Sequence, residues 1–85
     1  TVAPGVRRRI RLDGEKAMLV EVEFDKGAIG SLHSHPHEQL TYIVKGRMRF
    51  TIDGKAVEVP SGECIRMLPD APHEALALEP STSTS

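Results

Sequence analysis

Apolar side chains recur at every second position through most of the chain, and this period constrains the fold more than any other feature. In the segment 17–24, "AMLVEVEF", Val20 and Val22 share one parity while Glu21 and Glu23 occupy the other. Alternation with period two is typical of half-buried β-strands, because successive side chains of a strand point to opposite faces. No segment has a helical period over a useful length. The predicted strands span residues 6–12, 17–24, 30–35, 40–45, 47–53, 56–59, 63–68 and 73–78.

Turn residues separate these segments. The pairs Asp13-Gly14 and Asp53-Gly54 supply the positive φ angles that tight β-hairpins require. Short strands joined by turns rich in Gly and Pro predict an all-β protein, folded as a small barrel or sandwich. We expect a single domain over residues 1–79. The last segment, 80–85 ("PSTSTS"), has no apolar residue and is predicted to be disordered.

Composition limits the partners of the chain. With 85 residues it is close to the size at which one hydrophobic core is only marginally stabilising, so we expect a homodimer interface to supply further burial. The net charge of −1 argues against electrostatic capture of nucleic acid or of an anionic membrane. The basic segment 7–11, "RRRIR", is predicted to be a solvated strand face rather than a nucleic-acid patch. No apolar run approaches the roughly 20 residues of a membrane span.

Cys64 is the single cysteine, so no intrachain disulfide can form. We expect it to be a small buried residue, since nothing near it in the sequence could act as the base that a reactive thiol needs. No secretory signal is visible, and a cytoplasmic location is therefore expected.

Histidines cluster in the segment 33–39, "HSHPHEQ". His33 and His35 lie two residues apart, which puts both rings on one face of a strand. In a small barrel these rings can converge with Gln39 and with the distant His73, as a divalent metal requires of ligands held about 2.0–2.1 Å from the ion. The alternative is a set of solvent-facing histidines in a polar loop. His37 is predicted to be a rim residue, a donor behind the ligands, or an exposed loop residue.

A frame of glycines, prolines and histidines surrounds this cluster, and it closely resembles the two signature motifs of the cupin superfamily, the small metal-binding β-barrels. The resemblance covers residues 18–78 and implies a jelly-roll barrel, also called a double-stranded β-helix. It departs from the usual pattern at Gln39, where the family has Glu, and in lacking the terminal Asn of the second motif. The matching positions are Gly27, His33, His35, Gln39, Gly46, Gly54, Pro60, Gly62 and His73.

The amino-acid sequences of three segments narrow the resemblance to one group of cupins. "VRRRI", "FDKGAIGSLHSHPHEQLTYIVKGRMRFTIDG" and "APHEALALE" look like the short cupins of pectin and alginate breakdown, which open cyclic 4,5-unsaturated uronates to the linear keto form. This resemblance implies a metal held by His33, His35, Gln39 and His73, with Zn, Ni, Mn, Fe or Co as candidates. In those relatives a closing strand carries an Asp and then an Arg that serve the reaction. The segment 80–85 has no counterpart of them, and we allow for a barrel that lacks the closing C-terminal strand.

The chemistry of this ligand set points to an anionic substrate. Three neutral imidazoles and an amide oxygen leave a divalent ion its full charge, which favours a carboxylate such as that of a uronate. Glu38 is the rival of Gln39 as third ligand, but adjacent residues on a strand face opposite ways, and the spacing to Gly46 favours Gln39. Arg66 is a candidate for substrate binding if its side chain faces the cavity, against the alternative of an exposed strand arginine.

Two further groups are weaker candidates for proton transfer. Tyr42 has the parity opposite to Gln39 and is predicted to pack on the outer face or at an interface. Glu74 directly follows His73 and is predicted to point the other way along the strand. The residues that would transfer the proton are thus not identified by the sequence.

Several functions are compatible with the motif. The leading hypothesis is a metal-dependent enzyme that opens a uronate ring, with no nucleic-acid or membrane partner. The second is a non-catalytic, metal-dependent module that binds a small molecule. A three-His non-haem iron dioxygenase and a structural barrel without metal are the other two.

Overall fold

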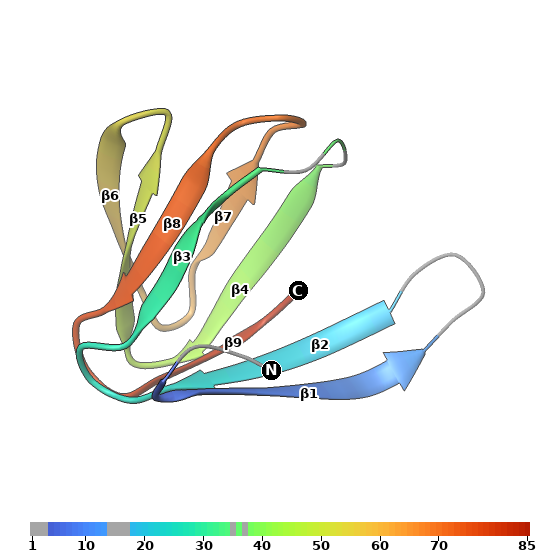
Figure 1. Ribbon diagram of the computed structural model, residues 1–85. Coiled ribbons are helices and arrows are strands. Elements are labelled where there is room, and N and C mark those ends of the chain that lie inside the picture. Colours follow the sequence, from blue (N-terminus) through green and yellow to red (C-terminus); the bar gives the residue numbers. More distant parts are fainter. Residues whose placement is uncertain (1–3, 14–17, 35, 37) are drawn as a thin grey trace.

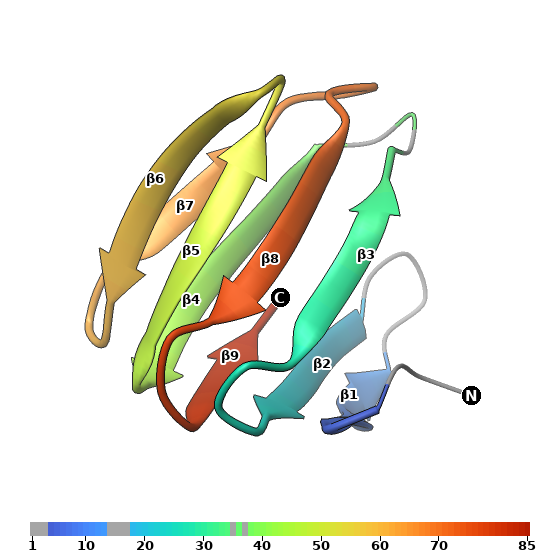
Figure 2. The same ribbon diagram turned by 60° about the vertical axis from the view of Figure 1, so that its left-hand side comes forward.

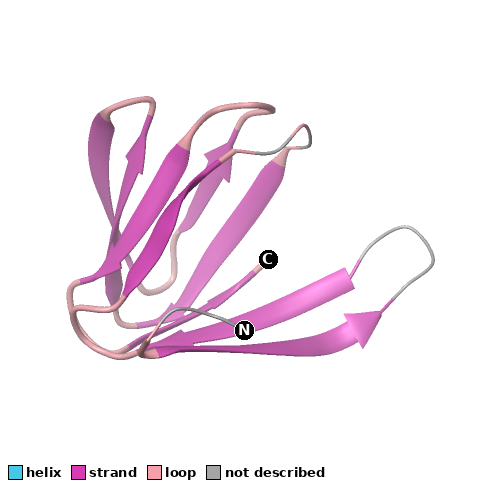
Figure 3. Ribbon diagram, viewed as in Figure 1, coloured by secondary structure: helices cyan, strands magenta, loops and turns pink. Residues whose placement is uncertain are grey.

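The computed structural model describes residues 4–13, 18–34, 36 and 38–85, and all its regular elements are β-strands (Figure 3). No helix able to cross a membrane occurs among these residues. The strands are β1 (Val6–Asp13), β2 (Met18–Phe24), β3 (Ile29–His33), β4 (Gln39–Lys45), β5 (Arg47–Ile52), β6 (Lys55–Pro60), β7 (Cys64–Met67), β8 (His73–Ala77) and β9 (Ser81–Thr84).

The alternating pattern predicted the first eight of these strands with bounds correct to within two residues. The turn chemistry is also confirmed between β5 and β6. Asp53 and Gly54 there have φ angles of 50° and 79°, as the predicted tight hairpin requires. Every paired strand is antiparallel, so short turns suffice to join the neighbours.

The strands form two facing sheets (Figures 1 and 2). The larger sheet has the order β1-β2-β9-β4-β7 and the smaller one β3-β8-β5-β6. Apart from the β1–β2 and β5–β6 pairs, consecutive strands belong to different sheets. The predicted all-β jelly roll is therefore confirmed. Figure 1 also shows that the β1–β2 ribbon extends away from the rest of the larger sheet.

The C-terminal segment differs from its prediction. Residues Ser81–Thr84, which we expected to be disordered, form β9 and pair with both β2 and β4. Ser81 and Ser83 are buried, while Thr82 and Thr84 alternate with them on the other face. The segment has no apolar side chain to reveal a strand, but its backbone hydrogen bonds on both sides hold it in place, and Thr favours extended conformations. The possibility that the barrel lacks a C-terminal strand is not borne out, because β9 pairs with strands on both of its sides.

The core lies between β4 and β7 on one side and β5, β6 and β8 on the other. Ile43 and Met48 are fully buried, and Met67 and Ala77 are each 1% exposed. These four residues occupy alternate positions whose strand neighbours are more exposed, as the period of two predicts. Phe24 and Phe50 extend this cluster toward the β1–β2 side.

The outer face of β4 is apolar. Leu40, Tyr42 and Val44 are 64%, 42% and 49% exposed, which confirms the outward position of Tyr42.

Cys64 is also exposed, contrary to our expectation of a buried thiol. It pairs with Tyr42 and is the first residue of the edge strand β7, on the outer face of that strand. The homodimer stays a prediction.

Candidate functional site

A cavity of about 350 Å³ lies between the two sheets on the side of β1, β2 and β3. Its wall is apolar where Val20, Val22 and Phe24 of β2 and Met67 of β7 contribute. Polar residues come from four strands and from the residue after β9. They are Arg8, Gln39, Thr41, His73, Glu74, Ser83 and Ser85.

His73 is the first residue of β8 and lines this cavity. It is 4% exposed, and its backbone lies between β3 and β5, opposite His33 and Ile52. The Nδ1 atom lies 2.9 Å from the carbonyl oxygen of Ala71. A carbonyl only accepts hydrogen bonds, so Nδ1 carries the proton and the lone pair is on Nε2. Metal-ligating histidines are commonly fixed in this way, with one nitrogen donating to a carbonyl and the other facing the ion.

Gln39 begins β4 and lines the same cavity as His73. Its Nε2 donates to Thr41 Oγ1 at 3.0 Å, and Thr41 Oγ1 lies 2.9 Å from Ser85 Oγ. An amide that donates through Nε2 can offer a cation only its oxygen Oε1. This partly buried chain of polar groups holds the Gln39 side chain in place, because its middle member, Thr41, is only 4% exposed.

Of the neighbours Glu38 and Gln39, only Gln39 lines the cavity, as the alternation of side chains along a strand predicted. Glu38 is exposed, and its Oε2 lies 3.4 Å from Arg66 Nη1, so it does not line the cavity wall. Arg66 is correspondingly on the outer face, where 63% of its side chain is exposed. It pairs with Leu40, another outward residue, so the candidate role of Arg66 in substrate binding does not fit its position.

The remaining predicted ligands are only partly described. The backbone of His33 pairs directly with that of His73 at the end of β3, while His35 and His37 lie outside the described residues. Among the residues that the structure does describe, no group of three or more His, Cys, Asp or Glu suitable for a metal ion is found. His73 and Gln39 line one cavity, and the tautomer of His73 is fixed. The imidazole nitrogen and the amide oxygen that they offer are suitable ligands for a transition metal.

Several cavity residues were missed by sequence reasoning. Thr41 has the parity of Gln39, which would have placed it on the inner face. Ser83 belongs to the segment assigned to disorder, and Arg8 to a run interpreted as one solvated face. Glu74 also borders the cavity, although it lines a depression on the outer side of the smaller sheet with Arg49 and Thr51.

Two facing antiparallel sheets that enclose a cavity lined by a histidine and an amide define a small jelly-roll protein with an internal polar site. The family model described as "Cupin domain" matches residues 20–82, and the chain belongs to this family. The resemblance stated on the motifs alone is therefore confirmed.

Comparison with individual proteins supports the same family. The chain is 32% identical to the pectin degradation protein KdgF of Dickeya dadantii over 76 residues, which cover 88% of this chain and 69% of that protein. The structure of KdgF from a Halomonas species matches 99% of this chain and 78% of its own, with 34% identity and a TM-score of 0.92. An RmlC-like cupin from Shewanella frigidimarina matches with 27% identity and a TM-score of 0.90, over 99% of this chain and 76% of its own.

Proposed function

We propose that this chain is a metal-dependent cupin of pectin breakdown that opens the ring of 4,5-unsaturated uronates to the linear keto form. The observation that carries the proposal is the joint position of His73 and Gln39 in one cavity, with the tautomer of His73 fixed by Ala71. The 32% identity to a protein named for pectin degradation supports the substrate class.

In this proposal His73 and Gln39 hold a divalent metal together with His33 and His35. The backbone pairing of His33 with His73 supports the grouping, because directly opposed residues of two antiparallel strands are neighbours. A metal bound by neutral ligands would supply a Lewis acid for a substrate oxygen. The hydrogen bond from Gln39 to Thr41 would keep the amide oxygen oriented, and the bond to Ala71 would keep Nε2 of His73 unprotonated.

The cavity fits a monosaccharide better than a polymer. A volume of about 350 Å³ is at the small end of ligand sites. Hydroxyl groups of Thr41, Ser83 and Ser85 line it and are suited to the hydroxyls of a sugar, while the apolar residues of β2 would shield one side of the ring from water.

The test follows the ultraviolet absorbance of a 4,5-unsaturated uronate monosaccharide mixed with the protein, whose metal content is measured in parallel. We expect the conjugated double bond to disappear with the native chain. His73→Ala should lose bound metal and slow the reaction more than about 100-fold, since it removes a ligand and not merely a neighbour of one. Glu38→Ala changes an exposed residue beside Gln39 that does not line the cavity, so it is the matched control and should keep both metal and rate.

Other outcomes separate the alternatives. Metal binding that depends on His73 without any turnover would favour a non-catalytic binding module. Turnover that requires oxygen would favour the dioxygenase. A melting temperature unchanged by a chelator would reject the metal site, because an ion bound only to the native state must stabilise it.

A further inference from the structure

Arg8 is the cation of the basic run that lies on the inner side of β1. It pairs with Val22, and its neighbours on the same parity are Val6, which packs against the core, and Ile10, which pairs with the buried Val20. Val20 and Val22 both line the cavity, and Arg8 lines it with them. Among the side chains that the structure describes, the inner face of the β1–β2 ribbon is therefore apolar except at Arg8.

Arg7 and Arg11 of the same strand differ from Arg8 in having carboxylate partners. Arg7 Nη2 lies 3.0 Å from Asp25 Oδ1, and this hydrogen bond and charge raise the pKa of the Arg7 guanidinium. Arg11 Nε lies 3.5 Å from Glu21 Oε1. Arg8 forms no ion pair with any carboxylate of the described residues. Arg8 is an exposed residue that lines the cavity beside the apolar residues of β2, so its guanidinium is accessible to a ligand that enters the cavity.

Three other polar residues of the cavity, Gln39, Thr41 and His73, come from strands that are not next to β1. In the larger sheet β2 and β9 lie between β1 and β4, and β8 belongs to the smaller sheet. Glu74, the other formally charged residue of the lining, alternates along β8 with His73 and Ala75, and its register partner Thr51 belongs to the outer depression. Arg8 is thus the cationic residue that the described cavity lining offers to an anion.

We infer that Arg8 binds the carboxylate of the ligand and so selects uronates over neutral sugars. The inference rests on the proposed function for the ligand class and adds the residue that recognises the acid group. A guanidinium is suited to this task because it meets a carboxylate with two parallel N–H donors. The ligand would lie with its carboxylate at β1 and its hydroxyls toward Thr41 and His73.

An inward charge on an edge strand has another known use, since it prevents the strand from pairing with a second molecule. β1 is an edge strand of the larger sheet, so this use must be separated from binding. The two roles predict different results for Arg8→Ala, namely association of the protein in one case and loss of selectivity in the other.

The experiment measures the affinity of D-galacturonate and of D-galactose by titration calorimetry, because neither sugar contains the reactive double bond. We expect the native protein to bind the acid at least about tenfold more tightly than the neutral sugar. Arg8→Ala should remove this preference and leave galactose unchanged, and Arg8→Lys should recover part of it. Arg9→Ala, which removes the adjacent outward arginine, is the matched control and should keep the preference.

The inference is overturned if the native protein does not prefer the acid, or if Arg8→Ala keeps the preference and only associates into larger species. Turnover of the unsaturated uronate separates this result from the proposed function. Turnover with an unchanged KM in Arg8→Ala rejects the inference alone. Selective binding of galacturonate through Arg8 without turnover in the native protein rejects the proposed function alone.

Discussion

The two halves of the sandwich are built on the same alternating pattern but are filled differently. Between β4, β7 and the β5–β6 hairpin, the inner residues are long, and Ile43 and Met48 are fully buried without lining the cavity. Between β1, β2 and β3, the inner residues leave a cavity of about 350 Å³. The difference lies in side-chain size rather than in the period of the pattern.

The hollow half contains small residues at inner positions of three strands. Gly30 of β3 pairs with Ala75 of β8, and Ser83 of β9 pairs with Val22 and Ile43. All of these residues line the cavity except Ile43. Short inner side chains leave space between the sheets in this half, whereas long inner side chains fill the corresponding space in the other half. The filled half therefore supplies stability, and the hollow half supplies a site.

The largest effect should come from truncating the filled half. Met48→Ala should lower the free energy of unfolding by about 4 kcal/mol, because it removes a fully buried side chain from a packed region and leaves a new void. Val22→Ala should cost only about 1–2 kcal/mol, since it borders an existing cavity and creates little additional void. Urea unfolding of both variants measures the difference. Equal losses would contradict the contrast between the halves.

The tight contact beneath the β4–β5 turn provides the second test. Gly46 has a φ of 89°, and a Cβ there would collide with Ser81 Oγ and with the carbonyl oxygen of Pro80. We expect Gly46→Ala to cost about 3 kcal/mol, from backbone strain and from the displacement of β9.

Gly54 is the matched control for this prediction. It has a φ of 79°, but nothing lies within 4 Å of an added Cβ. Gly54→Ala should therefore cost only the strain, about 1–2 kcal/mol. Thermal unfolding of the two variants would reveal whether the contact with β9 matters, and similar melting temperatures would argue against it.

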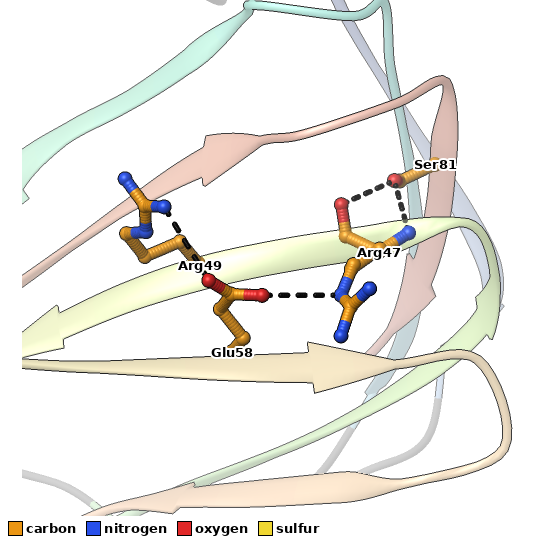
Figure 4. A network of polar contacts seen from close by, with 4 residues as sticks. All are labelled: Arg47, Arg49, Glu58 and Ser81. Carbon is orange, nitrogen blue, oxygen red and sulfur yellow. Dashed lines mark hydrogen bonds and ion pairs between the residues drawn. The ribbon is translucent and has the colours of Figure 1, made fainter.

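The smallest effects concern the polar network that joins β5, β6 and β9 (Figure 4). Ser81 is 3% exposed, and its Oγ accepts a hydrogen bond from the backbone N–H of Arg47 at 3.0 Å. Ser81→Ala should cost about 1–2 kcal/mol, because it leaves a partly buried N–H without its acceptor.

Glu58 provides the exposed end of the same network. Its Oε1 lies 3.2 Å from Arg47 Nε, and its Oε2 lies 3.4 Å from Arg49 Nη2. All three side chains are more than 40% exposed. Glu58→Ala should change the free energy of unfolding by less than about 1 kcal/mol, and this small loss should shrink further in high salt. A loss from Glu58→Ala larger than that from Ser81→Ala would reverse the expected order.

Sequence reasoning succeeded where the information is local. Alternation identified eight strands, and the Asp53-Gly54 pair identified a hairpin, because both signals depend on neighbouring residues. It also separated Gln39 from Glu38, since parity along one strand decides which of the two faces inward. It failed for Cys64, whose burial depends on which face of β7 another sheet covers.

The position of β9 shows a different kind of failure. The Ser and Thr residues of 81–84 carry no hydrophobic signal, and the strand exists because β2 and β4 offer it hydrogen bonds on both sides. Nothing within the segment itself indicates that two distant strands leave this space between them.

The sequence by itself determined the all-β class, most of the strands and the cupin family, because these follow from period and motif. Only the tertiary structure decided that Arg8 lines the cavity, that Arg66 does not, and that Gln39 and His73 line it from the two facing sheets. The register between strands far apart in the chain sets those positions, and register depends on packing that no local stretch of sequence contains.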